Sequence, residues 1–253
     1  MGAVGVIVSD IVTVLNGHYL QNKRSKMRNA IITMIVVLLL AAGASAYPDK
    51  DFYSDGNIMP GEHWNNVRIY NDDTIVDMLG GGVDSVGSYD RSTFNLVDGY
   101  INTLVAWESG TLNVSGGYVY TLDAMGQSTV SFSGLANGVS FGVEDSATLN
   151  VTGGSTIGIW AYNSGTLNLR GGVVSDLVVG RDQSIINVHG FGLGKTDTGG
   201  IYGYGQIYGA WWDETPFTIS LGTAETYSHV NLVPEPGSII LLVFGSFLLR
   251  QRR

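Results

Sequence analysis

The sequence predicts an all-β protein folded as a parallel β-solenoid of about six to seven coils, each about 18–19 residues long. A four-residue pattern recurs at steps of 18, 18, 19, 18 and 19 residues. Apolar and polar residues alternate within each copy, as in a strand with one buried face. A glycine, often one of a pair, follows shortly after each copy and allows a turn. The copies begin at Thr93, Thr111, Thr129, Thr148, Thr166 and Ile185.

The amino-acid composition excludes some kinds of site and some kinds of partner. The 253 residues include 36 glycines but no cysteine, so neither a disulfide nor a thiolate metal site can form. Residues 47–233 contain 20 acidic and 6 basic residues, a net charge of −14. Such a surface repels nucleic acid. We therefore expect no nucleic-acid partner, and no motif indicates a cofactor.

Residues 1–46 are interpreted as a secretory signal peptide. Four basic residues at 23–28 precede an apolar run over 31–40, and Ala44-Ser45-Ala46 follows. A basic segment, an apolar segment and a small-residue A-x-A site together define such a peptide. Ala44 and Ala46 are the expected recognition residues for signal peptidase. A membrane anchor is the alternative, but the apolar run is shorter than a membrane-spanning helix requires. Met27 would also be a suitable initiator methionine shortly before the apolar run. Residues 1–26 are therefore a candidate misassigned extension.

Residues 47–73 are polar and are expected to form an N-terminal cap, followed by solenoid repeats over residues 74–197. Superposing the repeats predicts columns of inward-facing apolar residues. The first strand of each repeat gives Phe94, Leu112, Val130, Leu149, Leu167 and Ile186, and then Leu96, Val114, Phe132, Val151, Leu169 and Val188. The second strand gives Leu104, Leu122, Phe141, Ile159 and Leu177, and then Ala106, Ala124, Val143, Ala161 and Val179.

One repeat cannot bury its own apolar face, so the coils must stack on one another. Stacking turns an outward column into a ladder whose side-chain amides can hydrogen-bond: Asn95, Asn113, Ser131, Asn150, Asn168 and Asn187. An antiparallel sandwich is the competing fold, because it also has short strands and glycine-rich turns. It does not require the same residue at every 18th or 19th position.

The chain after the repeats divides into two segments. Residues 198–232 are rich in aromatic residues and are expected to cap the open end of the solenoid. Residues 233–253 begin with Val233-Pro234-Glu235-Pro236. An apolar stretch over 237–249 and a basic stop made of Arg250, Arg252 and Arg253 complete the segment. A buried terminal helix is the alternative, but such a helix would not end in a basic cluster.

This ordered tail resembles the PEP-CTERM sorting signal of bacterial envelope proteins. The resemblance implies a C-terminal transmembrane sorting helix, transient attachment to the membrane, and processing by an exosortase-type protease near the motif. The repeats resemble the Gly- and Ser/Thr-rich repeats of bacterial surface proteins, including the passenger regions of self-associating autotransporters. These resemblances imply export to the bacterial cell envelope, the cell surface or the extracellular matrix.

Signals for catalysis are weak. Arg170 and His189 occupy one outward column on consecutive coils, but no Asp or Glu shares that column, and acid–base cleavage needs such groups. A column of turn residues, Asp90, Glu108, Asp145 and Asp182, could hold Ca²⁺ or form a solvated acidic edge. Trp211-Trp212-Asp213-Glu214 could stack on sugar rings or pack within the cap. We assign no catalytic and no metal-binding residue.

The sequence therefore predicts a non-enzymatic, exported β-solenoid with a structural or adhesive role. Its expected partners are signal peptidase, the exosortase-type protease and extracellular polysaccharide, with the membrane contacted through the C-terminal segment before processing. The alternative function is a polysaccharide-binding or polysaccharide-cleaving β-helix.

Overall fold

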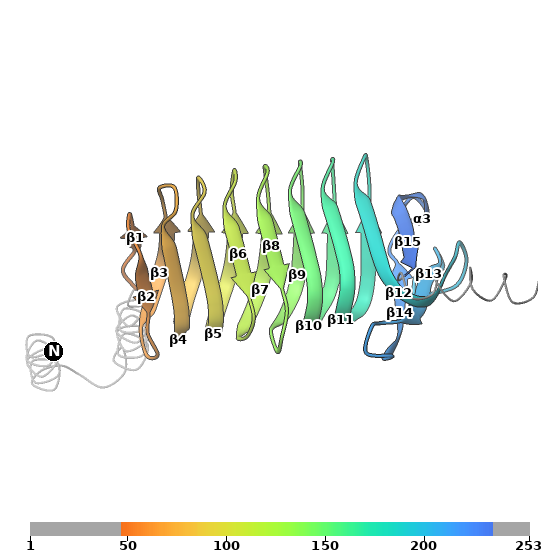
Figure 1. Cartoon of the computed structure of the whole chain (residues 1–253), viewed down its shortest axis with the longest axis horizontal. Helices are drawn as coiled ribbons and strands as arrows, with labels where there is room; N and C mark the ends of the chain where they lie inside the picture. Colours follow the sequence, from red (N-terminus) through yellow and green to blue (C-terminus); the bar gives the residue numbers. More distant parts are fainter. Residues whose placement is uncertain (1–46, 235–253) are drawn as a thin grey trace, which may run out of the picture. The chain divides into compact units, whose positions relative to one another are not determined.

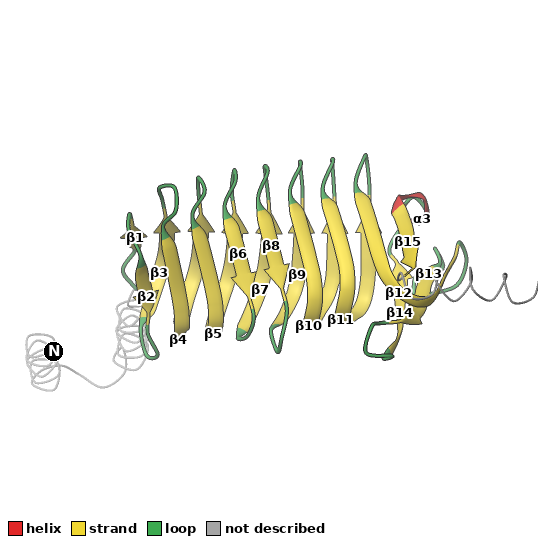
Figure 2. Ribbon diagram, viewed as in Figure 1, coloured by secondary structure: helices red, strands yellow, loops and turns green. Residues whose placement is uncertain are grey.

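The computed structural model describes residues 47–234. This part is almost entirely β-structure (Figures 1 and 2). Its strands are β1 (Lys50–Phe52), β2 (Gly56–Ile58), β3 (His63–Ile69), β4 (Ile75–Ser88), β5 (Thr93–Ala106), β6 (Thr111–Val114), β7 (Tyr118–Ala124), β8 (Thr129–Phe132), β9 (Asn137–Val143), β10 (Thr148–Ala161), β11 (Thr166–Gly180), β12 (Ile185–Thr196), β13 (Gln206–Ala210), β14 (Pro216–Leu221) and β15 (Val230–Pro234). One short helix, α3 (Thr226–His229), precedes β15.

The strands stack as coils in parallel register. Thr93 pairs with Thr111, Thr111 with Thr129, and Thr129 with Thr148, so equivalent residues of successive repeats lie side by side. Every described pairing except those of β13 is parallel. The fold is a parallel β-solenoid of about eight turns with about 18 residues per coil, which confirms the predicted class and excludes the sandwich.

The solenoid has more coils than the six to seven that we expected, because residues before the repeats join it. Strand β1 pairs in parallel with β3, and both β2 and β3 pair in parallel with β4. These strands bury Phe52, Ile58, Val67 and Ile69 in the same apolar core as the repeats. Residues 50–69 therefore continue the stack, although their sequence lacks the repeated pattern.

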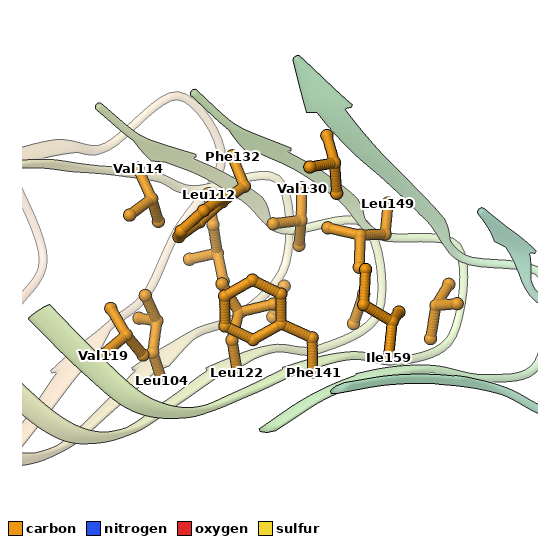
Figure 3. Packing of buried hydrophobic residues seen from close by; sticks show 14 of the residues in the cluster. Leu104, Leu112, Val114, Val119, Leu122, Val130, Phe132, Phe141, Leu149 and Ile159 are labelled. Atoms are coloured by element: carbon orange, nitrogen blue, oxygen red, sulfur yellow. The ribbon is translucent and has the colours of Figure 1, made fainter. Parts of the chain in front are cut away.

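Each coil has two arms that face each other across the core. The first arm is the recurring pattern, such as Thr111–Val114, and the second arm follows the glycine turn, as in Tyr118–Ala124. In Figure 3, Leu112 of a first arm lies opposite Leu122 and Phe141 of second arms. Phe132 contacts Phe141 edge-on, with ring centroids 4.7 Å apart. The inward side chains of the two arms thus form one continuous apolar core along the stack.

The predicted first-arm columns are confirmed, since all twelve residues are buried. The second-arm columns are correct through Ile159 and Ala161 but wrong in the next coil. Strand β11 has one residue more than β10 at this point, so Ile159 pairs with Val178 rather than with Leu177. Val178 is fully buried, whereas Leu177 is only partly buried. Gly180, not Val179, pairs with Ala161.

The turns between the two arms require glycine for two physical reasons. Gly172 has a φ of +84°, a conformation that L side chains rarely adopt. A Cβ at this position would also lie only 2.7 Å from the carbonyl oxygen of Gly153 in the preceding coil. The close stacking of coils therefore excludes any other residue at this turn.

The predicted amide ladder forms on the outer face of the first arms. The Nδ2 of Asn113 donates to the Oδ1 of Asn95 at 2.8 Å, and Asn168 donates to Asn150 at 2.9 Å. Asn187 donates to Asn168 at 2.9 Å. Two residues that we did not predict extend the ladder, because Asn95 donates to Asp77 and Asn231 donates to Asn187. Ser131 occupies the position between Asn113 and Asn150 and has no amide to offer.

The C-terminal segment departs from the coil pattern. Strand β13 pairs antiparallel with β12 and β14, while β14 pairs in parallel with β11. Strand β15 returns to pair in parallel with β12. The ammonium of Lys195 ties these pieces together by donating to the carbonyl oxygens of Tyr227 at 2.9 Å and Val230 at 2.7 Å. Burial lowers the pKa of Lys195.

Substitution of a core leucine should be far more damaging than substitution of its outward neighbour. Leu149→Asp places an unpaired carboxylate in the core and should cost about 3–5 kcal/mol. Asn150→Asp keeps the oxygen that accepts the bond from Asn168, so it should cost much less. Urea unfolding of polypeptide 47–234, whose core lies within these residues, measures both losses. Equal losses would contradict the inward and outward assignments.

Completing the amide ladder should stabilise the solenoid. Ser131→Asn supplies the missing amide between Asn113 and Asn150, and one hydrogen bond contributes about 0.5–1.5 kcal/mol. The matched control is Ser133→Asn, because Ser133 lies on the same strand surface outside the ladder and donates to the carbonyl of Val114. Thermal melts should show a higher Tm for Ser131→Asn only, and an equal effect of the two substitutions would refute the ladder's role.

Candidate functional site

Four aromatic rings form a ladder on the outer surface of the second arms. Each comes from the residue just before the corner turn, the segment that joins a second arm to the next coil. The ring centroids of Tyr53 and Tyr70 are 5.4 Å apart, those of Tyr70 and Tyr89 are 5.1 Å apart, and those of Tyr89 and Trp107 are 6.4 Å apart. Neighbouring planes are within 17° of parallel. We call these four residues the aromatic ladder.

Sequence reasoning missed this ladder, although its signal is present. The signal is a single position that lies between the apolar strand residues and the polar turn residues. An aromatic residue stands there in Tyr70-Asn71, Tyr89-Asp90, Trp107-Glu108 and Tyr162-Asn163. The later coils carry Met125, Glu144, Tyr162 and Arg181 at this position, with the Arg181 guanidinium 6.0 Å from the ring centroid of Tyr162.

A hollow of about 190 Å³ lies beside the aromatic ladder. It is lined by Arg68, Gly87 and Val105, which pair across three coils in one outward column. The ring of Tyr89 lies close to Gly87, since a Cβ there would be 2.7 Å from a ring carbon. Trp107 lines the hollow on the next coil. The ring of Tyr89 therefore covers Gly87, which is buried, and the hollow has an aromatic side.

The opposite side of the hollow is polar and held in place by hydrogen bonds. Arg68 forms ion pairs with Asp49 at 2.9 Å and with Asp51 at 3.0 Å. The side-chain amide of Asn66 donates to Asp49 at 2.8 Å. Hydrogen bonds from Asn66 and Asn65, together with Arg68, hold the pKa of Asp49 below its ordinary value. Donors and acceptors are thus fixed in direction before any ligand arrives.

Two carboxyl groups lie further along the same face. Asp123 occupies the outward column of Arg68 and Gly87, and Glu144 occupies the column of the aromatic ladder one coil later. Burial, and then repulsion from Glu144, raise the pKa of Asp123 above its ordinary value. Sequence reasoning did not associate these residues, because one comes from a strand and the other from the edge of a corner turn.

The predicted outward column of Arg170 and His189 is interrupted at Arg170, because Thr152 of the preceding coil pairs with Gly171 rather than with Arg170. Arg170 and His189 directly follow Leu169 and Val188, which pair with each other. His189 pairs with Val233 of β15.

The backbone conformation of the turns explains why acidic residues recur in the turn column. Asp90, Glu108, Asp145 and Asp182 all have positive φ, between 53° and 60°, a conformation that Asp and Asn tolerate better than most residues. The Oδ2 of Asp182 accepts a hydrogen bond from the backbone of Asn163 in the preceding coil at 3.3 Å. Among residues 47–234, no group of three or more His, Cys, Asp or Glu side chains could hold a metal ion.

The paired tryptophans of the C-terminal segment have different environments. Trp211 is buried, stacks on Phe217 with centroids 3.8 Å apart, and donates through Nε1 to the carbonyl of Gly172 at 2.9 Å. Trp212 is exposed and contacts Phe191 edge-on. Trp211 therefore packs within the cap, and only Trp212 is available to a ligand.

The predicted processing residues lie mostly beyond the described chain. Val233 and Pro234 are the last residues of β15, whereas Glu235, Pro236, Arg250, Arg252 and Arg253 fall outside residues 47–234, as do Ala44 and Ala46. Within the described part, no helix is long and apolar enough to cross a membrane.

Comparison with known proteins gave no matching family model, no matching curated protein and no matching solved structure. The function must therefore be argued from the residues of this chain.

Neutralising Asp123 should change how stability depends on pH. Its raised pKa means that the folded state disfavours the charged carboxylate, so stability is lost as pH rises from the ordinary pKa through the raised one. Asp123→Asn should therefore raise the Tm at about pH 7 and lose this advantage near pH 3. Melts at both pH values test this, with Asp197→Asn at an exposed position as the control. An equal gain at both pH values would contradict the electrostatic cause.

Proposed function

We propose that this protein is an exported, non-enzymatic β-solenoid with a structural or adhesive role at the bacterial cell surface or in the extracellular matrix. One observation carries the proposal: a signal-peptide pattern precedes the solenoid, and a sorting-signal pattern follows it. Signal peptidase and an exosortase-type protease are its proposed processing partners. The C-terminal segment contacts the membrane before processing.

The geometry of the last strand supports this order of events. Strand β15 ends at Pro234, where Val233 pairs with His189 and Pro234 with Gly190. Cleavage beyond Pro234 would leave every described strand intact. The solenoid could then be released, or transferred to another acceptor in the envelope, without losing part of its fold.

Polysaccharide binding is a second candidate function, and one feature favours it. Tyr89 and Trp107 of the aromatic ladder and the fixed polar groups of Arg68 and Asn66 border one hollow on the outer surface. Sugars are commonly bound between an aromatic ring and directed hydrogen-bonding groups, because a sugar ring has both apolar faces and hydroxyl groups.

The C-terminal processing can be tested in the native host. We expect mass spectrometry of the surface fraction to find chains that begin at Tyr47 and end within residues 233–237. The double substitution Glu235→Ala and Pro236→Ala should leave the precursor in the membrane fraction, because the motif is lost while β15 is untouched. Gln251→Ala serves as the control. A mature surface protein that ends at Arg253 would show permanent anchoring instead.

A further inference from the structure

We infer that the hollow lined by Arg68, Ser85 and Trp107 binds one residue of a neutral polysaccharide chain. The hollow is bordered by Tyr89 and Trp107 on one side and by Arg68 and Asn66 on the other. This inference rests on the proposed adhesive role and names the chemical class of the ligand and its site.

The size of the hollow limits the ligand. Sites that enclose a whole small molecule usually measure about 300–1,000 Å³, whereas this hollow measures about 190 Å³. It is also formed on the outer face of the second arms. The hollow therefore suits a single ring of a longer polymer rather than a free small molecule.

The walls of the hollow match the two kinds of surface that a sugar ring presents. Trp107 is 39% exposed and offers aromatic surface, whereas the ring of Tyr89 is stacked between Tyr70 and Trp107. Arg68 and Asn66 are already held by Asp49, so they lose little freedom when a hydroxyl group binds. Ser85 adds a hydroxyl group at the rim.

The charge of the site selects a neutral ligand. Two carboxylates, Asp49 and Asp51, accompany the single cation Arg68. The segment 47–233 carries a net charge of −14, so it repels a polyanion before contact. An acidic polysaccharide would therefore be disfavoured both at long range and in the hollow.

Affinity electrophoresis of polypeptide 47–234 tests the inference. The gels contain amylose, dextran, xylan, mannan or a β-1,3-glucan as neutral polymers, and alginate or polygalacturonate as acidic ones. We expect at least one neutral polymer to retard the protein and neither acidic polymer to do so. Absence of retardation by every neutral polymer, or retardation by acidic polymers alone, would overturn the inference.

A substitution that fills the hollow locates the site. Ser85→Phe should weaken binding about tenfold or more, and this variant leaves the aromatic ladder unchanged. Its matched control is Ser140→Phe, because Ser140 lies in the same outward column, three coils further along and away from the hollow. Equal binding by the two variants would place the glycan elsewhere and overturn the assignment.

Removal of the aromatic wall provides a second test. Trp107→Ala should weaken binding, whereas Tyr162→Ala, at the equivalent corner position of a distant coil, should not. Circular dichroism melts establish that each variant is folded before it is compared. These measurements use purified protein, so a negative result leaves the proposed export and processing unaffected, and those are tested separately in the host.

Discussion

The stacking of parallel coils at one strand spacing, about 4.8 Å, is the constraint on which the rest of this structure depends. Each side chain lies directly above its counterpart, so every position must tolerate near-copies of itself on both sides. Amides satisfy this requirement by hydrogen-bonding along Asn150, Asn168 and Asn187. Aromatic rings satisfy it by stacking, and glycine satisfies it at Gly172 by leaving room for the backbone of the coil below.

Charged side chains are the least compatible with this stacking, because like charges repel one another at the strand spacing. The solenoid places many of its acidic residues at corner turns, where water is close and the backbone needs Asp or Asn at positive φ. There the carboxylate of Asp182 accepts a backbone hydrogen bond from the neighbouring coil. Asp123 is less well placed, since burial and Glu144 both disfavour its charged form.

Much of the fold could be predicted from the sequence, because the apolar columns and the amide column repeat in step with the coils. The prediction of Leu177 failed because one inserted residue shifts the register within a single arm, and both spacings place an apolar residue near the core. The coils over residues 50–69 could not be predicted, since their strands bury apolar residues without repeating the pattern. The aromatic ladder was missed although an aromatic residue recurs at one fixed position before the corner turn. The hollow could not be predicted, because it depends on residues of different types from three coils, such as Arg68, Gly87 and Trp107.

The position of Pro234 at the end of β15 has a mechanical consequence. A pulling force on the segment after Pro234 would act directly on β15. A pull along the solenoid axis would break the hydrogen bonds between β15 and β12 one after another. The bonds of Lys195 would be loaded only after β15 has detached, because its ammonium joins β12 to the carbonyls of Tyr227, in α3, and Val230, at the start of β15. Beyond that point each coil is held mainly by its neighbours, so the body would unravel stepwise from this end and dissipate the force gradually.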